Sequence, residues 1–196
     1  MGIELKILNN SGLKKILIVG VFHGDEPQGE FFINKYLEKE YKDSKNALYF
    51  IPRLNKNNNR TNANGVDLNR NFPTKNWQKS ARGDYFGGDM PNSEEETRFL
   101  VNLIEDNSFD AIVTIHAPYK IINYDGPALE LAQKISSILN YPVESDIGYP
   151  TPGSFGTYCG VERQIPVITI EIDENKAPEE LLERFIKLFD YLRCEY

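Results

Sequence analysis

Short apolar runs alternate along this chain with segments in which apolar residues recur every three or four positions. Alternation of this kind is typical of an α/β fold, in which strands and helices follow one another. We predict β-strands at five short runs that are rich in aliphatic and aromatic residues, 3–8, 16–21, 47–51, 111–115 and 167–172. The run 111–115 is almost purely apolar, as expected of a central strand covered on both faces.

The periodic segments predict four helices, and therefore a sheet with helices on both faces. The first should cover about 27–41 and the last about 177–194. Ser93 and Glu96 have the spacing of a capping box, so a second helix is expected to open there. The third helix should end near Asn140. The side chains expected to face the core are Phe32, Ile33, Tyr36, Leu37, Leu100, Leu103, Ile104, Leu131, Ile135, Ile138, Leu139, Leu182, Phe185, Phe189 and Leu192.

Two segments show neither the short apolar runs expected of strands nor the spacing of three or four positions expected of helices. Residues 55–90 are polar and rich in Asn, Gly and Arg, and residues 148–160 are dense in Gly and Pro. Long segments without secondary structure in a compact domain are usually functional or disordered. No internal repeat or linker is found, so residues 1–196 are expected to form a single domain.

Composition narrows the classes of function. The net charge is −7 and no basic run occurs, which argues against a nucleic-acid partner. No apolar stretch has the length of a membrane span, and polar residues interrupt the first twenty positions, so neither a membrane anchor nor a signal peptide is expected. Cys159 and Cys194 lack metal-type spacing, so we expect reduced thiols in the cytoplasm, with an external location as the less favoured alternative.

The chain contains only two histidines, and each lies at the end of a predicted strand. His23 follows the run 16–21, Glu26 comes three residues later, and His116 ends the run 111–115. Ligand sites of open α/β sheets lie beyond the carboxyl ends of the strands, so these side chains can converge. Two histidines and one carboxylate form a zinc site that leaves a fourth position open for water. We therefore predict one zinc ion per chain, held by His23, Glu26 and His116.

Each of these residues has a simpler explanation when it is taken alone. His23 and Glu26 would be a solvated loop histidine and a glutamate favoured at the start of a helix. His116 would be a histidine packed in the core. Three matching positions at two strand ends are much harder to assign to packing, so the metal site is preferred.

The segment 60–72 contains the sequence Gly-Val-Asp-Leu-Asn-Arg-Asn, between the two histidine regions. In this segment the chain resembles the zinc carboxypeptidases of the M14 type, whose hallmark is Gly-Val-Asp-x-Asn-Arg-Asn at this place. The resemblance covers about residues 17–172 and implies the fold of that family, a mixed, twisted β-sheet with helices on both faces. The alternative is an Asn-rich surface loop held by side-chain-to-backbone turns, which leaves the two arginines unexplained.

The resemblance also implies roles for residues of this segment. Asn69 and Arg70 would hold the free carboxylate of the substrate, which suits a planar guanidinium that can bind a carboxylate bidentately. Arg60 would polarise the scissile carbonyl and stabilise the oxyanion. Asp67 would accept the second ring N–H of His23 and so orient that ligand.

Glu171 lies in an otherwise apolar predicted strand. A buried carboxylate without a partner is costly, so it needs a positive neighbour, a bound water or a raised pKa. A salt bridge at the rim of the strand would satisfy this requirement. The family resemblance implies instead that Glu171 is the general base, which takes a proton from water and later passes it to the leaving amine.

The loop 148–160, together with 115–118 and 164–171, is similar to the bacterial murein peptide amidase branch of the family. Members of that branch cleave the bond between γ-D-glutamate and meso-diaminopimelate in cell-wall peptides, so the implied partner is a small peptide with a free carboxylate. Tyr158 would take the place of the mobile substrate-binding tyrosine of digestive carboxypeptidases, and a structural aromatic is the alternative. Neither the residues that read the distal end of diaminopimelate nor the oligomeric state follow from the sequence.

The family also has an unusual cis peptide directly after the third metal ligand. Proline greatly lowers the cost of a cis bond, so we predict that the bond Ala117–Pro118 is cis.

Two rival functions fit parts of the pattern. N-acyl-amino-acid deacylases, such as aspartoacylase and succinylglutamate desuccinylase, also carry His-Gly-x-Glu and Asp-Leu-Asn-Arg segments. A non-catalytic module that binds cell-wall peptides is the other rival, but such a module would not need Glu171 as a base. The Pro-Thr-Pro-Gly-Ser-Phe-Gly loop favours the murein branch.

Overall fold

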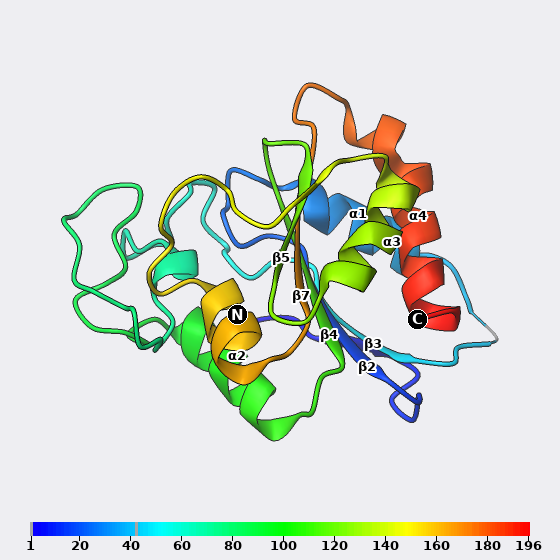
Figure 1. Cartoon of the computed structure of the whole chain (residues 1–196), viewed down its shortest axis with the longest axis horizontal. Coiled ribbons are helices and arrows are strands. Elements are labelled where there is room, and N and C mark those ends of the chain that lie inside the picture. The colour runs from blue at the N-terminus through cyan, green and yellow to red at the C-terminus, as the bar shows by residue number, and fades with distance from the viewer. Residues whose placement is uncertain (1, 42) are drawn as a thin grey trace.

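One mixed β-sheet organises the computed structural model of the chain, which describes residues 2–41 and 43–196. The sheet has seven strands in the order β1-β3-β2-β4-β7-β5-β6 (Figure 1). The strands β3, β2, β4 and β7 are parallel, whereas β1 and β5 run antiparallel to β3 and β7, and β6 is parallel to β5. The bounds are β1 (Lys6–Leu8), β2 (Lys15–Val19), β3 (Ala47–Ile51), β4 (Ala111–His116), β5 (Ile121–Asp125), β6 (Val143–Glu144) and β7 (Val167–Glu171).

Helices cover both faces of this sheet, as the sequence pattern predicts (Figure 1). The helices α1 (Gln28–Leu37), α3 (Leu129–Leu139) and α4 (Pro178–Cys194) pack together on one face. The helix α2 (Glu95–Asp106) and the short π-helical segment η2 (Thr157–Val161) cover the other.

The two apolar cores follow from the alternation of side chains along the strands. In β2, Ile16 and Ile18 face the helices α1, α3 and α4, whereas Leu17 and Val19 face α2 and η2. All four side chains are fully buried. A strand buried on both faces has no polar side, which explains the purely apolar runs in the sequence.

The predicted elements are present, with shifted ends. The first helix stops at Leu37 rather than Tyr41, whose hydroxyl donates to the Tyr36 carbonyl instead. The strands β5 and β6 are absent from the prediction, because β5 is half-buried and contains Asn and Asp, and β6 is only two residues long. Neither strand has the apolar run that the central strands show.

The predicted capping box at Ser93 and Glu96 is wrong. Glu94 is the N-cap of α2, and no side chain caps the helix there. The Ser93 hydroxyl donates to the carboxylate of Glu94 at 2.7 Å instead of capping the helix. The side chains of Asn62 and Asn64, in the long polar loop, donate to the same carboxylate. A tertiary contact has therefore taken the place of the local cap.

The parallel strands bring the predicted site to one edge of the sheet. His116 ends β4 directly opposite Glu171, which ends β7. His23 follows the neighbouring strand β2, beyond the same edge. The peptide bond Ala117–Pro118, just past β4, is cis, which confirms the prediction.

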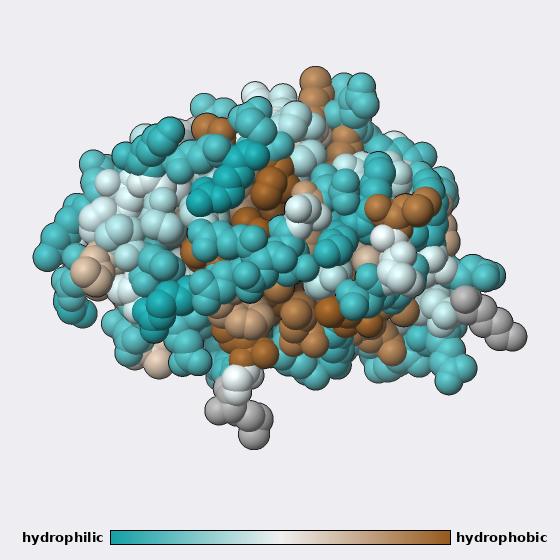
Figure 2. Space-filling view, turned by 90° about the horizontal axis from the view of Figure 1, so that it is seen from below, coloured by the Kyte–Doolittle hydropathy of each residue, from teal (hydrophilic) through white to brown (hydrophobic). Residues whose placement is uncertain are grey.

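Hydrophilic residues cover most of the face in Figure 2, and apolar residues gather near its middle. Within the described residues, no helix has the length and apolar character needed to cross a bilayer. Cys159 is buried and Cys194 exposed, and both are free, as the sequence predicts.

Candidate metal centre and catalytic cleft

His23, Glu26 and His116 meet at the carboxyl edge of the sheet, as predicted. One ligand atom from each of these residues lies within 4.8 Å of the other two. The Nδ1 atoms of His23 and His116 each lie 3.0 Å from a different oxygen of Glu26. Both imidazoles are buried, with 3% and 4% of their surfaces exposed.

The arrangement of donor atoms fits a zinc ion. Both rings present the same nitrogen, Nδ1, to the carboxylate of Glu26, so three donors converge on one place. The opposite nitrogen of His23, Nε2, lies 3.0 Å from Asp67 Oδ1. A carboxylate behind the ring fixes the orientation of a histidine ligand and the nitrogen that can bind a metal.

The charges at this place also suit a cation. Burial opposes a charge on His23, but hydrogen bonds to Asp67 and Glu26 outweigh it and raise the pKa of His23 to about 9. Burial lowers the pKa of His116 and so favours its neutral form. Although burial opposes its charge, Glu26 has a lowered pKa because both histidines hydrogen-bond to it. The His23 Nδ1 atom therefore binds a proton readily, and a divalent ion competes with that proton for the same atom.

Asp67 connects the metal set to Arg60. The carboxylate of Asp67 is fully buried, and its second oxygen accepts a hydrogen bond from Arg60 Nη2 at 3.1 Å. Arg60 Nη1 in turn lies 3.8 Å from Glu26 Oε1. Despite burial, the hydrogen bond to His23 and the charge of Arg60 lower the pKa of Asp67. This ion pair fixes a guanidinium beside the three donors.

A short 3₁₀ helix, η1 (Leu68–Arg70), presents the next two residues of the motif. Asp67 caps it by accepting the backbone N–H of Asn69 at 2.9 Å. The Asn69 side-chain oxygen accepts the backbone N–H of Phe155 at 2.9 Å, and Arg70 Nη1 donates to the Asn69 carbonyl at 2.7 Å. Asn69 and Arg70 are thus held against the loop 147–155.

Glu171 closes the far side of the cleft, with only 7% of its surface exposed. Burial, together with the nearby charge of Glu26, raises its pKa to about 8. Among the described residues, no hydrogen-bond partner reaches its buried Oε2 atom. No ion pair in the described part of the chain includes Glu171, so the salt bridge considered as an alternative is not formed. Glu171 instead lines the cleft as a buried carboxylate.

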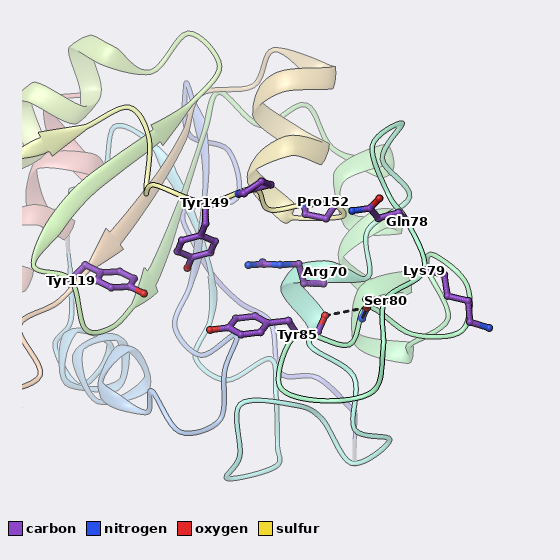
Figure 3. Close-up of a pocket in the computed structure, with 10 residues that line it drawn as sticks. Arg70, Gln78, Lys79, Ser80, Tyr85, Tyr119, Tyr149 and Pro152 are labelled. Atoms are coloured by element: carbon purple, nitrogen blue, oxygen red, sulfur yellow. Dashed lines mark hydrogen bonds between the residues drawn. The ribbon is translucent and has the colours of Figure 1, made fainter.

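The cleft itself has a volume of about 250 Å³. It adjoins a larger cavity of about 750 Å³, and the two share Arg70, Tyr85, Tyr119 and Tyr149 in their walls. In Figure 3 the Arg70 guanidinium extends between the rings of Tyr149 and Tyr85, with Tyr119 opposite. The cleft is lined by His23, Glu26, Arg60, Asn69, Arg70, Tyr85, His116, Ala117, Pro118, Tyr119, Ile147, Tyr149, Thr151 and Glu171.

The structure does not bring Tyr158, the expected substrate-binding tyrosine, to the cleft. Tyr158 is fully buried in η2 and lines neither cavity. Its ring packs 5.6 Å from that of Phe72 and lies under the guanidinium of Arg163 at 3.4 Å. The helical segment 155–163 turns this part of the predicted loop inward, where the ring packs as the structural-aromatic alternative expects.

Three tyrosines at the cleft were missed in the sequence. Tyr85, Tyr119 and Tyr149 are 56%, 52% and 39% exposed, although large aromatic rings usually bury most of their surface. They lie in loops without periodicity, and only the fold brings them together. The one available signal was the position of Tyr149 and Tyr85 inside the two long loops already suspected of a function.

The profile of the zinc carboxypeptidases matches residues 4–131. The chain belongs to the zinc carboxypeptidase family. It is therefore a hydrolase of a zinc-dependent family, and the expected fold is confirmed.

Individual relatives agree with this assignment. Murein peptide amidase A of Vibrio campbellii is 34% identical over 89% of this chain and 77% of the relative. Murein peptide amidase A of Escherichia coli K12 is 37% identical over 63% of this chain and 56% of the relative. The crystal structure of the murein-tripeptide amidase of E. coli O157 superposes with a TM-score of 0.80 at 29% identity, over 93% of this chain and 81% of that one. Carboxypeptidase A of Helicoverpa armigera shares the fold, with a TM-score of 0.76 at 14% identity over 97% of this chain and 63% of that one.

Proposed function

We propose that this chain is a zinc-dependent amidase that cleaves the γ-D-glutamyl–meso-diaminopimelate bond of cell-wall peptides. The observation that carries the proposal is the meeting of three metal donors, a buried carboxylate and two arginines in one cleft. The choice of substrate is supported by the murein peptide amidases among the relatives. The aspartoacylase-type deacylase remains the alternative that the experiment below tests.

His23, Glu26 and His116 would hold the zinc ion. When bound, zinc polarises a carbonyl as a Lewis acid and makes water nucleophilic near neutral pH.

Glu171 acts as the general base and then as the general acid. Its buried carboxylate accepts a proton from the attacking water and returns that proton to the leaving amine. Burial raises the pKa of Glu171 to about 8, close to a neutral working pH, which is the condition for efficient proton transfer in both directions.

Arg60 stabilises the negative charge that develops on the scissile carbonyl oxygen. Its ion pair with Asp67 holds the guanidinium in place before the substrate arrives. Preorganised donors of this kind cost no reorganisation during the reaction.

Asn69 and Arg70 bind the free carboxylate at the end of the peptide. A guanidinium and an amide offer several N–H donors in one direction, and a carboxylate can accept two from the arginine. The carboxylate contact selects peptides whose last residue carries a free C-terminus and places the scissile bond toward Glu171.

The adjoining cavity would take the side chain of that last residue. Its wall contains the guanidinium of Arg70 and the polar groups of Gln78 and Ser80, whereas the ammonium of Lys79, at its border, is paired with Asp89 at 3.5 Å. The side chain of diaminopimelate ends in an ammonium and a carboxylate, and a polar wall that contains Arg70 offers donors to that carboxylate. We also propose that residues 1–196 act as one domain, and that the enzyme works in the cytoplasm, where the thiols of Cys159 and Cys194 stay reduced.

The test is a comparison of substrates. The zinc-loaded protein is incubated with L-Ala-γ-D-Glu-meso-diaminopimelate, with the same peptide amidated at the carboxylate that Arg70 would bind, and with N-acyl amino acids. We expect free diaminopimelate from the first peptide only, identified by mass. Release of carboxylic acids from N-acyl amino acids alone would favour the deacylase. Tight binding of the peptide without cleavage, by protein that contains stoichiometric zinc, would favour the non-catalytic binder.

A further inference from the structure

Tyr85 lies against both arginines of the cleft. The guanidinium carbon of Arg60 is 4.8 Å from the centre of its ring, and that of Arg70 is 5.8 Å away. Both distances fall within the roughly 6 Å range of a cation–π contact. One aromatic ring therefore touches the two cations that the proposed function assigns to different tasks.

The backbone around Tyr85 is tied to the same motif. The Asp67 N–H donates to the Phe86 carbonyl at 2.8 Å, and the Asn71 side chain donates to the Gly87 carbonyl at 2.8 Å. Arg60 Nε donates to the Asp84 carbonyl at 3.2 Å. Phe86 anchors this loop in the interior with only 3% of its surface exposed. The ring of Tyr85 is thus carried by a segment fixed to residues 67–71.

Tyr85 itself is not placed there by burial, because 56% of its surface is exposed. Figure 3 shows the ring beside Arg70 at the mouth of the cavity, with the Ser80 hydroxyl bonded to the Tyr85 carbonyl at 3.3 Å. An exposed ring held in this way contributes little to the core. The main interactions of the Tyr85 ring are therefore its contacts with the guanidinium groups of Arg60 and Arg70.

We propose that Tyr85 is a positioning residue that holds Arg60 and Arg70 in their working orientations through one ring. The inference rests on the proposed function, since it concerns the two arginines used there. Without the ring, Arg60 loses one of the contacts that aim it at the oxyanion, and Arg70 loses one that aims it at the substrate carboxylate. The face of the ring is needed and its hydroxyl is not.

Kinetics of two variants test this division. Tyr85→Leu should lower kcat and raise KM, each by about two- to fivefold, the factor expected for losing one cation–π contact per arginine. Tyr85→Phe keeps the ring face and should stay within about twofold of the native enzyme in both constants. If Tyr85 had a mainly structural role, Tyr85→Leu would instead lower the melting temperature and leave kcat and KM of the folded enzyme near their native values.

The matched control is a second tyrosine–arginine contact far from the cleft. The guanidinium of Arg193 lies 4.6 Å from the ring of Tyr41, which lines neither cavity. Tyr41→Leu removes a comparable contact and should leave kcat and KM unchanged. Equal losses in Tyr41→Leu and Tyr85→Leu, native-like kinetics of Tyr85→Leu, or equal losses in Tyr85→Phe and Tyr85→Leu would each overturn the proposal.

A spectroscopic measurement separates this proposal from the proposed function. A stacked ring shifts the NMR signals of the Arg60 and Arg70 Nε–H groups, which Arg60→Lys and Arg70→Lys identify. Both signals should move in Tyr85→Leu and keep their native positions in Tyr85→Phe and Tyr41→Leu. If the native protein cleaves none of the peptides, the proposed function fails, and unmoved signals in Tyr85→Leu would still disprove the positioning contact by itself.

Discussion

At the scale of single residues, Asp67 shows how one buried carboxylate sets the geometry of the cleft. One oxygen accepts from the Asn69 N–H and faces His23 Nε2, and the other accepts from Arg60. A buried charge is tolerated only when it is paired and hydrogen-bonded, and Asp67 meets both conditions. It thereby orients a metal ligand, an arginine and the start of η1 together.

Glu171→Gln should lower kcat by about 10²- to 10⁴-fold, because an amide cannot accept the proton of the attacking water. The zinc content should stay the same, since Glu171 is not among the three converging donors. Steady-state kinetics and metal analysis measure both. Glu174→Gln, an exposed carboxylate three residues further on, is the matched control. Turnover of Glu171→Gln within tenfold of the native rate would contradict the role given to Glu171.

The variants Arg60→Ala and Arg70→Ala should change kcat and KM in different ways. Loss of one oxyanion donor should lower kcat by about 10²- to 10³-fold. Loss of the carboxylate contact should mainly raise KM, with a smaller loss in kcat because the contact also orients the bond. The measurement is a pair of kinetic profiles on the same tripeptide, and identical profiles for the two variants would refute the separate roles.

At the scale of elements, the cleft depends on loops packed tightly against η1. A Cβ atom on Gly153 would lie 2.3 Å from the Arg70 carbonyl, and the φ angle of Gly153 is 74°. Only glycine fits such an approach, so the loop 147–155 and η1 can touch there.

Gly153→Ala should therefore destabilise the protein and displace Arg70, raising KM. Gly65 is the matched control, since its φ angle is 75° but no heavy atom lies within 4 Å of an added Cβ. Gly65→Ala should cost about 1 kcal/mol of unfolding free energy from backbone strain alone. Urea unfolding and kinetics compare the two. Equal effects on KM would show that the close approach to Arg70 is unimportant.

The start of α2 is joined to the same motif through Glu94. Its carboxylate accepts from Asn62 at 2.8 Å and from Asn64 at 2.7 Å. Although burial opposes its charge, these bonds and that from Ser93 lower the pKa of Glu94. Because the pKa in the folded state is the lower one, the charged form stabilises the fold above the usual pKa of a glutamate.

Glu94→Gln should thus cost about 1–3 kcal/mol of unfolding free energy at pH 7. The difference from the native protein should begin to shrink as the pH falls below the ordinary glutamate pKa of about 4.3, and it should vanish once the pH has passed through the lowered pKa of the folded state. Urea unfolding at several pH values measures it, with the helix neighbour Glu95→Gln as control. A difference independent of pH would exclude the charge of Glu94 as the cause.

At the scale of the whole molecule, the proposed metal site joins the ends of β2 and β4 at one edge of the sheet. A ligand that binds only the folded state stabilises it by about 4 kcal/mol at a thousand times its dissociation constant. Removal of zinc by a chelator should lower the melting temperature by about 10 °C, and one equivalent of zinc should restore it. His116→Ala should bind no zinc and melt at the same temperature with and without the chelator. A melting temperature of the native protein that ignores both treatments would exclude a metal shared by the two strands.

The sequence by itself determined the central strands of the sheet, its main helices and the convergence of His23, Glu26 and His116 at its edge. Apolar runs identify β2, β3, β4 and β7, because strands buried on both faces contain few polar residues. The carboxyl ends of parallel strands share one edge, so His23, Glu26 and His116 could be brought together without coordinates, whereas the role of Glu171 was implied by the family resemblance. The chain has only two histidines, and each follows an apolar run, so the sequence itself indicates that they belong to one site.

Only the tertiary structure decided the rest. Tyr158 turned inward and Tyr85, Tyr119 and Tyr149 outward, because loop conformation depends on contacts between distant segments such as the Phe72 N–H and the Gly153 carbonyl. The cap expected at Ser93 was lost to the contacts of Glu94 with residues 62 and 64. No periodicity or residue spacing in the sequence predicts the positions of these tyrosines or the loss of the cap, since both depend on which surfaces the fold brings into contact.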